Sequence, residues 1–215
     1  LWQRGLEMAK QRDHTINSQW WMNLAWLESN AGNCAAARGA VTQALALDRP
    51  AAALSSARIL ASCGELAFAQ SLVHEVESQN SSDTLMQKVW LPVTKAALAL
   101  QRRETTQVLD LLQATKRYEG AAQFWPAYLR GQAYLRLQNA AAARAEFQAI
   151  LAHRGYDPHS LLYAAAYLGL ARAAALAGDL NQSRQAYQDL LALWTEADAD
   201  LPLLRTVRKE YEQVR

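Results

Sequence analysis

The sequence has few of the residues that favour sheets, tight turns or disorder. In 215 residues, valine, isoleucine and threonine together supply only 20, and glycine and proline supply 9 and 5. β-Branched side chains suit the pleated surface of a sheet, so we do not expect a strand-based architecture. Alanine and leucine, both good helix formers, together supply 76 residues. The composition therefore predicts a folded all-α chain that is large enough to bury a core without metals.

The sequence also lacks a charge bias and a long apolar run. It has 22 basic and 20 acidic residues, a formal net charge of +2, and neither a basic run nor an acidic tail. We therefore expect no nucleic-acid partner. The longest apolar stretch, 161–171, falls well short of the roughly 20 residues that cross a bilayer. No membrane span is expected in this chain.

Only two cysteines are present, Cys34 and Cys63, and neither has the spacing of a metal site. We expect two small buried side chains. In an oxidising compartment they could pair, because Cys34 opens the second helix of one expected hairpin and Cys63 closes the first helix of the next. The four histidines form no i, i+4 pair, so we expect no metal and no cofactor.

Motifs of known catalytic sites are missing as well. The sequence has no phosphate-binding loop, no dinucleotide fingerprint, no hydrolase elbow and none of the motifs of a kinase catalytic domain. We expect no enzymatic activity from these residues.

What the sequence does contain is a recurring two-helix pattern. Four turns are followed by a small residue and, four positions on, by a larger one, which suits helices that cross closely. The pairs are Ala37 and Val41, Ala69 and Val73, Ala143 and Phe147, and Ser183 and Tyr187. The expected turn positions are Gly32, Gly64, Arg103, Gln138 and Gly178.

This pattern predicts five antiparallel helix pairs in 16–200, with a further helix at each end. The pairs are expected at approximately 17–49, 51–79, 82–116, 121–154 and 159–196. Residues 1–15 are interpreted as the remaining helix of a preceding repeat, so we expect the array to belong to a longer chain. Residues 201–215 are expected to form a capping helix with a polar outer face.

The first and fourth copies resemble the tetratricopeptide repeat (TPR). The matching residues are Trp21, Leu24, Ala25, Gly32, Ala37, Ala44, Leu45, Gly131, Tyr134, Ala143 and Phe147. The resemblance implies a solenoid of helix pairs that curves into a right-handed α-α superhelix. Over most of the chain, segments such as VWLPVTKAALAL and YLGLARAAALAGD further resemble the C-terminal repeat region of bacterial, acidobacterial-type serine/threonine protein kinases.

The resemblance implies a non-catalytic interaction or scaffold module, the regulatory or sensor region of such a kinase. Two alternatives stay open: the repeat arm of a winged-helix transcriptional regulator, and a purely structural or self-associating array. The compartment also stays open between the cytoplasm and, for a membrane-spanning parent, the extracytoplasmic side of the inner membrane.

The expected binding surface is the concave groove of the superhelix, where a peptide or partner protein would contact the first helix of each pair. Its residues are Gln19, Met22, Trp26, Asn30, Arg58, Trp90, Trp125, Tyr128, Gln132, Arg136 and Arg172. Aromatic side chains beside arginines are typical of binding hot spots.

Packing between repeats is the alternative for these side chains. For Trp26, we regard packing and partner contact as equally good interpretations. For Trp90 and Trp125 we favour packing, because these residues precede Pro92 and Pro126 at the expected openings of two helices. The arginines could likewise pair with neighbouring repeats.

Overall fold

A computed structural model describes residues 14–79, 82–157, 160 and 162–215 of the chain. Within these residues helices are the only regular secondary structure, which confirms the expected all-α class. The helix expected at 1–15 lies almost wholly outside the described residues. The chain divides into two compact units, Leu1–Gln101 and Arg102–Arg215.

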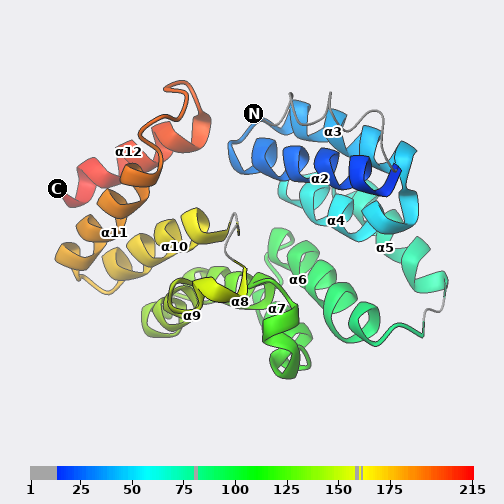
Figure 1. Cartoon of the computed structure of the whole chain (residues 1–215). Helices are drawn as coiled ribbons and strands as arrows, with labels where there is room; N and C mark the ends of the chain where they lie inside the picture. Colours follow the sequence, from blue (N-terminus) through cyan, green and yellow to red (C-terminus); the bar gives the residue numbers. More distant parts are fainter. Residues whose placement is uncertain (1–13, 80–81, 158–159, 161) are drawn as a thin grey trace. The chain divides into compact units, whose positions relative to one another are not determined.

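The first unit is built from helices that pair with their neighbours in the chain. Helices α2 (His14–Asn30) and α3 (Cys34–Leu47) form one hairpin, and α4 (Arg49–Ser62) and α5 (Leu66–Ser78) form the next (Figure 1). Helix α6 (Leu91–Gln101) follows a π-helical turn, η1 (Met86–Trp90). Helix α4 contacts both α2 and α6, so these three helices lie next to one another.

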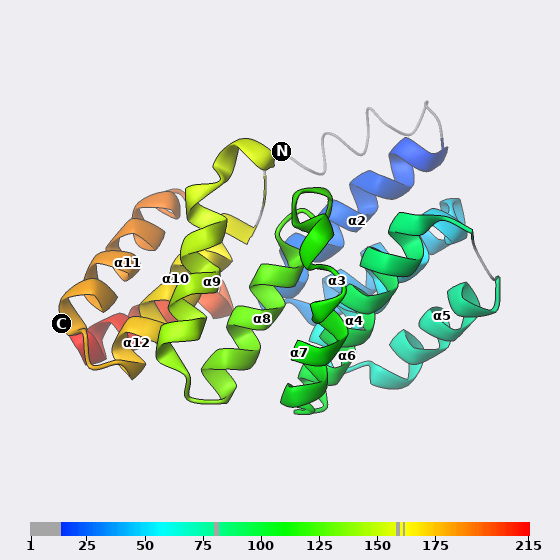
Figure 2. The ribbon, with the colours of Figure 1, turned by 90° about the horizontal axis from the view of Figure 1, so that it is seen from below.

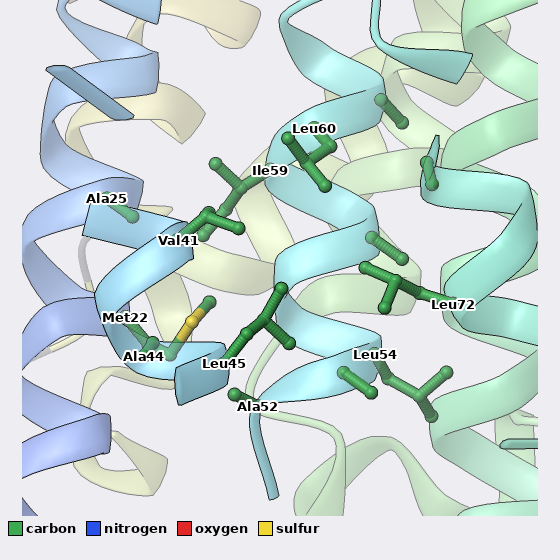
Figure 3. Close-up of a cluster of buried hydrophobic side chains, with 14 of the residues drawn as sticks. Met22, Ala25, Val41, Ala44, Leu45, Ala52, Leu54, Ile59, Leu60 and Leu72 are labelled. Atoms are coloured by element: carbon green, nitrogen blue, oxygen red, sulfur yellow. The ribbon is translucent and has the colours of Figure 1, made fainter. Parts of the chain in front are cut away.

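Apolar side chains from four helices form the core of this unit. Met22 from α2, Val41 from α3, Leu60 from α4 and Leu72 from α5 are all buried in one cluster (Figure 3). Asp48 connects α3 to α4 and accepts a hydrogen bond from the Ala51 N–H, which caps the new helix. The hairpins are therefore joined by a short connection and a shared apolar layer.

The second unit repeats this arrangement. It contains α7 (Thr105–Gln113), α8 (Trp125–Arg136), α9 (Ala140–Ala152), α10 (Leu162–Leu176), α11 (Leu180–Leu193) and α12 (Pro202–Val214), with 3-10 turns η2 (Lys116–Ala121) and η3 (Arg154–Tyr156). Helices α8 and α9 form one hairpin and α10 and α11 another, and α8 also contacts α10 (Figure 2). Helix α12 packs on α11 at the C-terminal end.

All five expected turn positions have a left-handed backbone. The φ angles are 85° at Gly32, 83° at Gly64, 64° at Arg103, 58° at Gln138 and 78° at Gly178. Four of the turns also close with a backbone hydrogen bond of 2.8–2.9 Å. Its donor is the N–H of the residue after the turn position, as in Asn33, and its acceptor is the carbonyl five residues before that donor, as in Glu28. The predicted turns are thus confirmed, including the two that lack glycine.

The small and large residues after each turn are buried as predicted. Phe147 shows the reason most clearly, because its ring lies against two backbone segments, at Gly131 of α8 and Gly169 of α10. A Cβ atom added at Gly131 would lie 2.6 Å from the ring, and one added at Gly169 would lie 2.4 Å from it. The two glycines let α9 pack closely on both first helices of this unit.

The expectation that Trp90 opens a helix is wrong. The chain is already helical before it, and Trp90 ends the π-helical turn that runs directly into α6. Pro92 lies inside this continuous helix, where it has no N–H for the regular hydrogen-bond ladder. The Leu91 N–H bonds to the Met86 carbonyl five residues back, so a wider turn accommodates the proline.

The expectation of two buried, unpaired cysteines is also wrong. Cys34 and Cys63 are half-buried and form a disulfide, with their Cα atoms 5.5 Å apart. Cys34 is the first residue of α3, and Cys63 is the C-cap of α4. The bond therefore joins two successive hairpins where their turns lie side by side.

Candidate functional site

In the first unit, the expected site residues of α2 differ widely in exposure. Gln19 is exposed, whereas Met22 is buried at 8% exposure and its sulfur accepts a hydrogen bond from the Ser56 hydroxyl. Trp26 is half-buried and packs against the apolar cluster, and its carbonyl accepts a 2.8 Å hydrogen bond from the Asn30 amide. Met22 and much of Trp26 thus belong to the core.

Arg58 and Trp90, from α4 and η1, lie together. The Arg58 guanidinium is 5.6 Å from the centre of a Trp90 ring and donates hydrogen bonds to the hydroxyls of Thr94 (3.1 Å) and Ser55 (2.9 Å). Arg58 is buried at 8% exposure, and burial lowers its pKa to about 10. This arginine fixes α4 to α6 through side-chain contacts that sequence spacing does not reveal.

In the second unit, α8 presents four expected residues. Trp125 is its first residue, as predicted, and contacts Tyr128 ring to ring at 6.2 Å. Tyr128 also packs on Phe147, at 6.5 Å between ring centres, which holds the phenol in place. Gln132 and Arg136 follow at intervals of four residues, so they share a face with Tyr128. Gln132 is half-buried and Arg136 is exposed.

Arg172, on α10, is held by the C-terminal helix. Its guanidinium donates two hydrogen bonds to the Glu210 carboxylate, at 2.8 and 2.9 Å, and the Tyr187 hydroxyl donates a third at 2.8 Å. Burial raises the pKa of Glu210, but these hydrogen bonds outweigh it and hold that pKa below its usual value. Arg172 therefore stabilises the docking of α12.

Arg103 is a residue of this site that was predicted only as a turn. It is exposed. Burial lowers the pKa of Arg136, and the charge of Arg103 lowers it further. Burial raises the pKa of Tyr128, while the charges of Arg172 and Arg136 lower it. The charges of two arginines thus act on one phenol, and Arg103 acts on one of these arginines. The sequence signal that could have indicated Arg103 as a site residue is a basic residue at a turn beside an aromatic first helix.

Arg130 is the other arginine of α8, and it belongs to the packed side of the helix. It donates to Glu146 at 2.7 and 2.8 Å and to Glu119 at 2.5 Å. Burial lowers its pKa, but the bonds to the two carboxylates more than reverse the shift and raise it. This buried ion cluster fixes η2 and α9 to α8.

The described part of the chain contains no group of three or more His, Cys, Asp or Glu side chains that could hold a metal ion. In the same residues no helix combines the length and apolar character that crossing a membrane requires. Comparisons of the chain with protein-family models, with curated proteins and with solved structures found no match.

Proposed function

We propose that this chain is a non-catalytic protein-interaction module, a TPR-like array of helix hairpins whose partner binds to the first helices. The stacking of first helices within each unit, α2 on α4 on α6 and α8 on α10, supports a solenoid arrangement. The turn geometry that repeats at five positions supports the same reading.

One observation carries the proposal. Tyr128, Gln132 and Arg136, here called the α8 face, make no side-chain hydrogen bond or ion pair with any residue that the structure describes. The opposite side of the same helix is buried, including Ala127 and Arg130. Aligned polar groups beside a fixed aromatic ring, with their hydrogen-bonding capacity unused, suit the recognition of a partner chain.

The resemblance of the repeats supports a bacterial serine/threonine kinase as the parent, with the array as its regulatory or sensor region. A winged-helix regulator is the alternative parent. The coding sequence that adjoins the array in its gene distinguishes them, since a kinase supplies a glycine-rich loop with H-R-D and D-F-G motifs.

Site-specific photo-crosslinking tests the α8 face. A photoreactive amino acid replaces Gln132 in one variant and Gln148, which is exposed on α9, in the matched control. We expect a crosslinked partner from position 132 and not from position 148. The partner is then purified, and its affinity is measured by calorimetry for the parent array and for Tyr128→Phe and Gln132→Ala.

Loss of each side-chain group is expected to weaken binding about three- to tenfold, the scale of one hydrogen bond. Equal crosslinking from both positions, or a purified partner that binds both variants as tightly as the parent array, contradicts the proposal.

A further inference from the structure

The two helices that the disulfide joins are linked to each other at both ends. Asp48 connects the end of α3 to the start of α4, and the bond between Cys34 and Cys63 connects the start of α3 to the end of α4. Both cysteines are half-buried, and the residues beside them at the turns, including Asn33 and Gly64, are exposed. A small thiol therefore has a path to the bond from solvent.

The two cysteines lie at helix ends of opposite polarity. Cys34 is the first residue of α3, at the positive end of its dipole, whereas Cys63 follows α4 at the negative end. The first turn of α3 contains no acidic residue, and the Asn33 side chain makes no capping hydrogen bond to it. This turn thus presents backbone N–H groups to a negative charge. A thiolate is therefore stabilised on Cys34 and disfavoured on Cys63.

Charged side chains near the bridge leave this asymmetry in place. Arg38, one turn along α3 from Cys34, favours a thiolate there, and it pairs at 2.8 Å with Glu65. Glu65 lies two residues after Cys63 and opposes a thiolate at that position. Glu28 of α2 opposes a thiolate on Cys34, and its carboxylate accepts a 2.9 Å hydrogen bond from the neighbouring Asn33 amide. The polarity of the helix ends therefore decides which sulfur is the better leaving group.

We propose that Cys34 and Cys63 form a reversible thiol–disulfide switch, in which Cys34 is the sulfur that leaves on reduction and attacks on oxidation. The reductant is a dithiol, and the oxidant is a small disulfide. The inference goes beyond the proposed function, because it concerns the joint between two hairpins and not the surface that binds a partner. The state of the switch decides whether α3 and α4 are joined covalently at one end or at both.

Reduction proceeds by two thiol exchanges. One thiolate of the dithiol attacks the Cys63 sulfur, and the bond to Cys34 breaks with its electron pair leaving on the Cys34 sulfur. The second thiolate of the dithiol attacks its own first sulfur in this mixed disulfide, which releases Cys63. The dithiol becomes a disulfide, the protein gains two electrons, and the protons that the dithiol gave up are available to the two released sulfurs.

Oxidation by glutathione disulfide is the reverse process. The Cys34 thiolate attacks one glutathione sulfur, and the other glutathione leaves as a thiolate. The Cys63 thiolate then attacks the Cys34 sulfur and displaces the second glutathione. The protein loses two electrons, and two glutathione thiols are formed.

Thiol counting by mass spectrometry after maleimide labelling tests whether the switch is reversible. The full chain is treated with excess dithiothreitol, freed of it, and then treated with glutathione disulfide. We expect two thiols after reduction, none after oxidation, and unchanged helical circular dichroism throughout. A bond that resists dithiothreitol in the folded chain, or that opens only with loss of helical signal, overturns the switch.

The asymmetry between the two sulfurs is tested in the reduced parent chain and in single-cysteine variants. Brief exposure of the reduced chain to glutathione disulfide is expected to place glutathione on Cys34, as located by peptide mass mapping. At neutral pH, iodoacetamide is expected to alkylate Cys34 in Cys63→Ser about tenfold faster than Cys63 in Cys34→Ser, because more of Cys34 is thiolate. Glutathione on Cys63, or equal alkylation rates, would show that Cys34 is not the reactive sulfur.

A matched pair of glutamates tests the role of the helix end in the Cys63→Ser variant. Ala36→Glu adds a negative charge to the first turn of α3, and Gln43→Glu adds the same charge more than two turns further along the helix. Both positions are exposed. Ala36→Glu is expected to slow alkylation of Cys34 about three- to fivefold, the scale of one charge at a helix N-terminus, and Gln43→Glu is expected to leave the rate unchanged. Equal rates in the two variants would contradict stabilisation of the thiolate by the start of α3.

Discussion

Phe147 is the residue on which the packing of the second unit depends most visibly. Its side chain is fully buried, and it touches the backbone of two first helices at glycines that have no room for a Cβ atom. The close approach of α8, α9 and α10 therefore depends on the large side chain of Phe147 and on the lack of a side chain at Gly131 and Gly169.

This packing predicts that Gly131→Ala lowers the free energy of unfolding. The added methyl group would meet the Phe147 ring, and overpacking of this kind costs about 1–3 kcal/mol. Chemical denaturation measures the change. Gly39→Ala is the control, because no atom lies within 4 Å of the position of its Cβ. There the substitution is expected to stabilise α3 by about 0.5–1 kcal/mol through helix propensity alone.

A second substitution, at Phe147, tests whether the loss of stability in Gly131→Ala comes from contact with the Phe147 ring. Phe147→Leu makes room beside Gly131, so the double variant is expected to lose less stability than the two single variants together. Strict additivity of the two changes would contradict the contact.

At the scale of the element, α12 is attached by polar contacts as well as by apolar ones. Leu204 and Val207 are buried, and Glu210 accepts hydrogen bonds from Arg172 and Tyr187 on two preceding helices. Helix α12 packs on α11, so these polar contacts contribute to its attachment beside the apolar ones.

The docking of α12 is expected to weaken in acid. The pKa of Glu210 is lower in the folded state than in the unfolded chain, where a glutamate titrates near about 4.3. Its contribution to stability is therefore complete above that value and is lost as the pH falls through the folded pKa. Hydrogen exchange of the α12 amides is expected to show Glu210→Gln destabilised by about 1.5 kcal/mol at neutral pH.

The difference between Glu210→Gln and the parent is expected to shrink as the pH falls through the folded pKa of Glu210, because the parent side chain then becomes neutral as well. Glu212→Gln is the control on the same helix, because Glu212 is exposed and its ion pair is a 3.4 Å contact with the exposed Arg215. A pH-independent difference for Glu210→Gln would show that the ionised carboxylate does not hold α12.

At the scale of the molecule, the disulfide marks a difference between the two units. It lies wholly in the first unit and closes a segment with a sequence separation of 29. By chain entropy, a loop of this length stabilises the folded state by about 3.6 kcal/mol. The double variant Cys34→Ser, Cys63→Ser is expected to lower the free energy of opening of the α3 and α4 amides by about this amount. Hydrogen exchange measures the change.

The amides of α10 and α11 serve as the internal control in the same experiment, because both cysteines belong to the first unit. A thiol count on the protein from its native compartment shows whether the bond is present there. Equal loss of protection in both units, or no loss in either, would contradict the predicted role of the bridge.

The features that the sequence predicted are those set by local chemistry. The all-α class follows from composition and helical periodicity, and Gly32 and Gly178 mark their turns because few other residues adopt a positive φ. Arg103 and Gln138 have the same φ without glycine, and only the repeat spacing indicated them.

The features that the sequence did not predict depend on contacts between distant residues. Arg172 and Glu210 are separated by 38 positions, and no local pattern connects them. Cys34 and Cys63 form a disulfide because two turns lie side by side. Their spacing in the sequence left this bond as one of two alternatives, the other being two separate buried side chains. Met22 and Arg58 are buried because neighbouring first helices cover them, so a helical wheel assigns them to the wrong surface.

The covalent link between the first two hairpins also sets a mechanical limit on the chain. When the ends of the protein are pulled apart, residues between Cys34 and Cys63 cannot extend, because the two ends of that segment stay 5.5 Å apart at their Cα atoms. About 100 Å of contour length is thereby withheld from stretching, at roughly 3.3–3.6 Å per residue. Tension applied along the chain would pass across the bridge, so the segment of α3 and α4 between the two cysteines would carry no load.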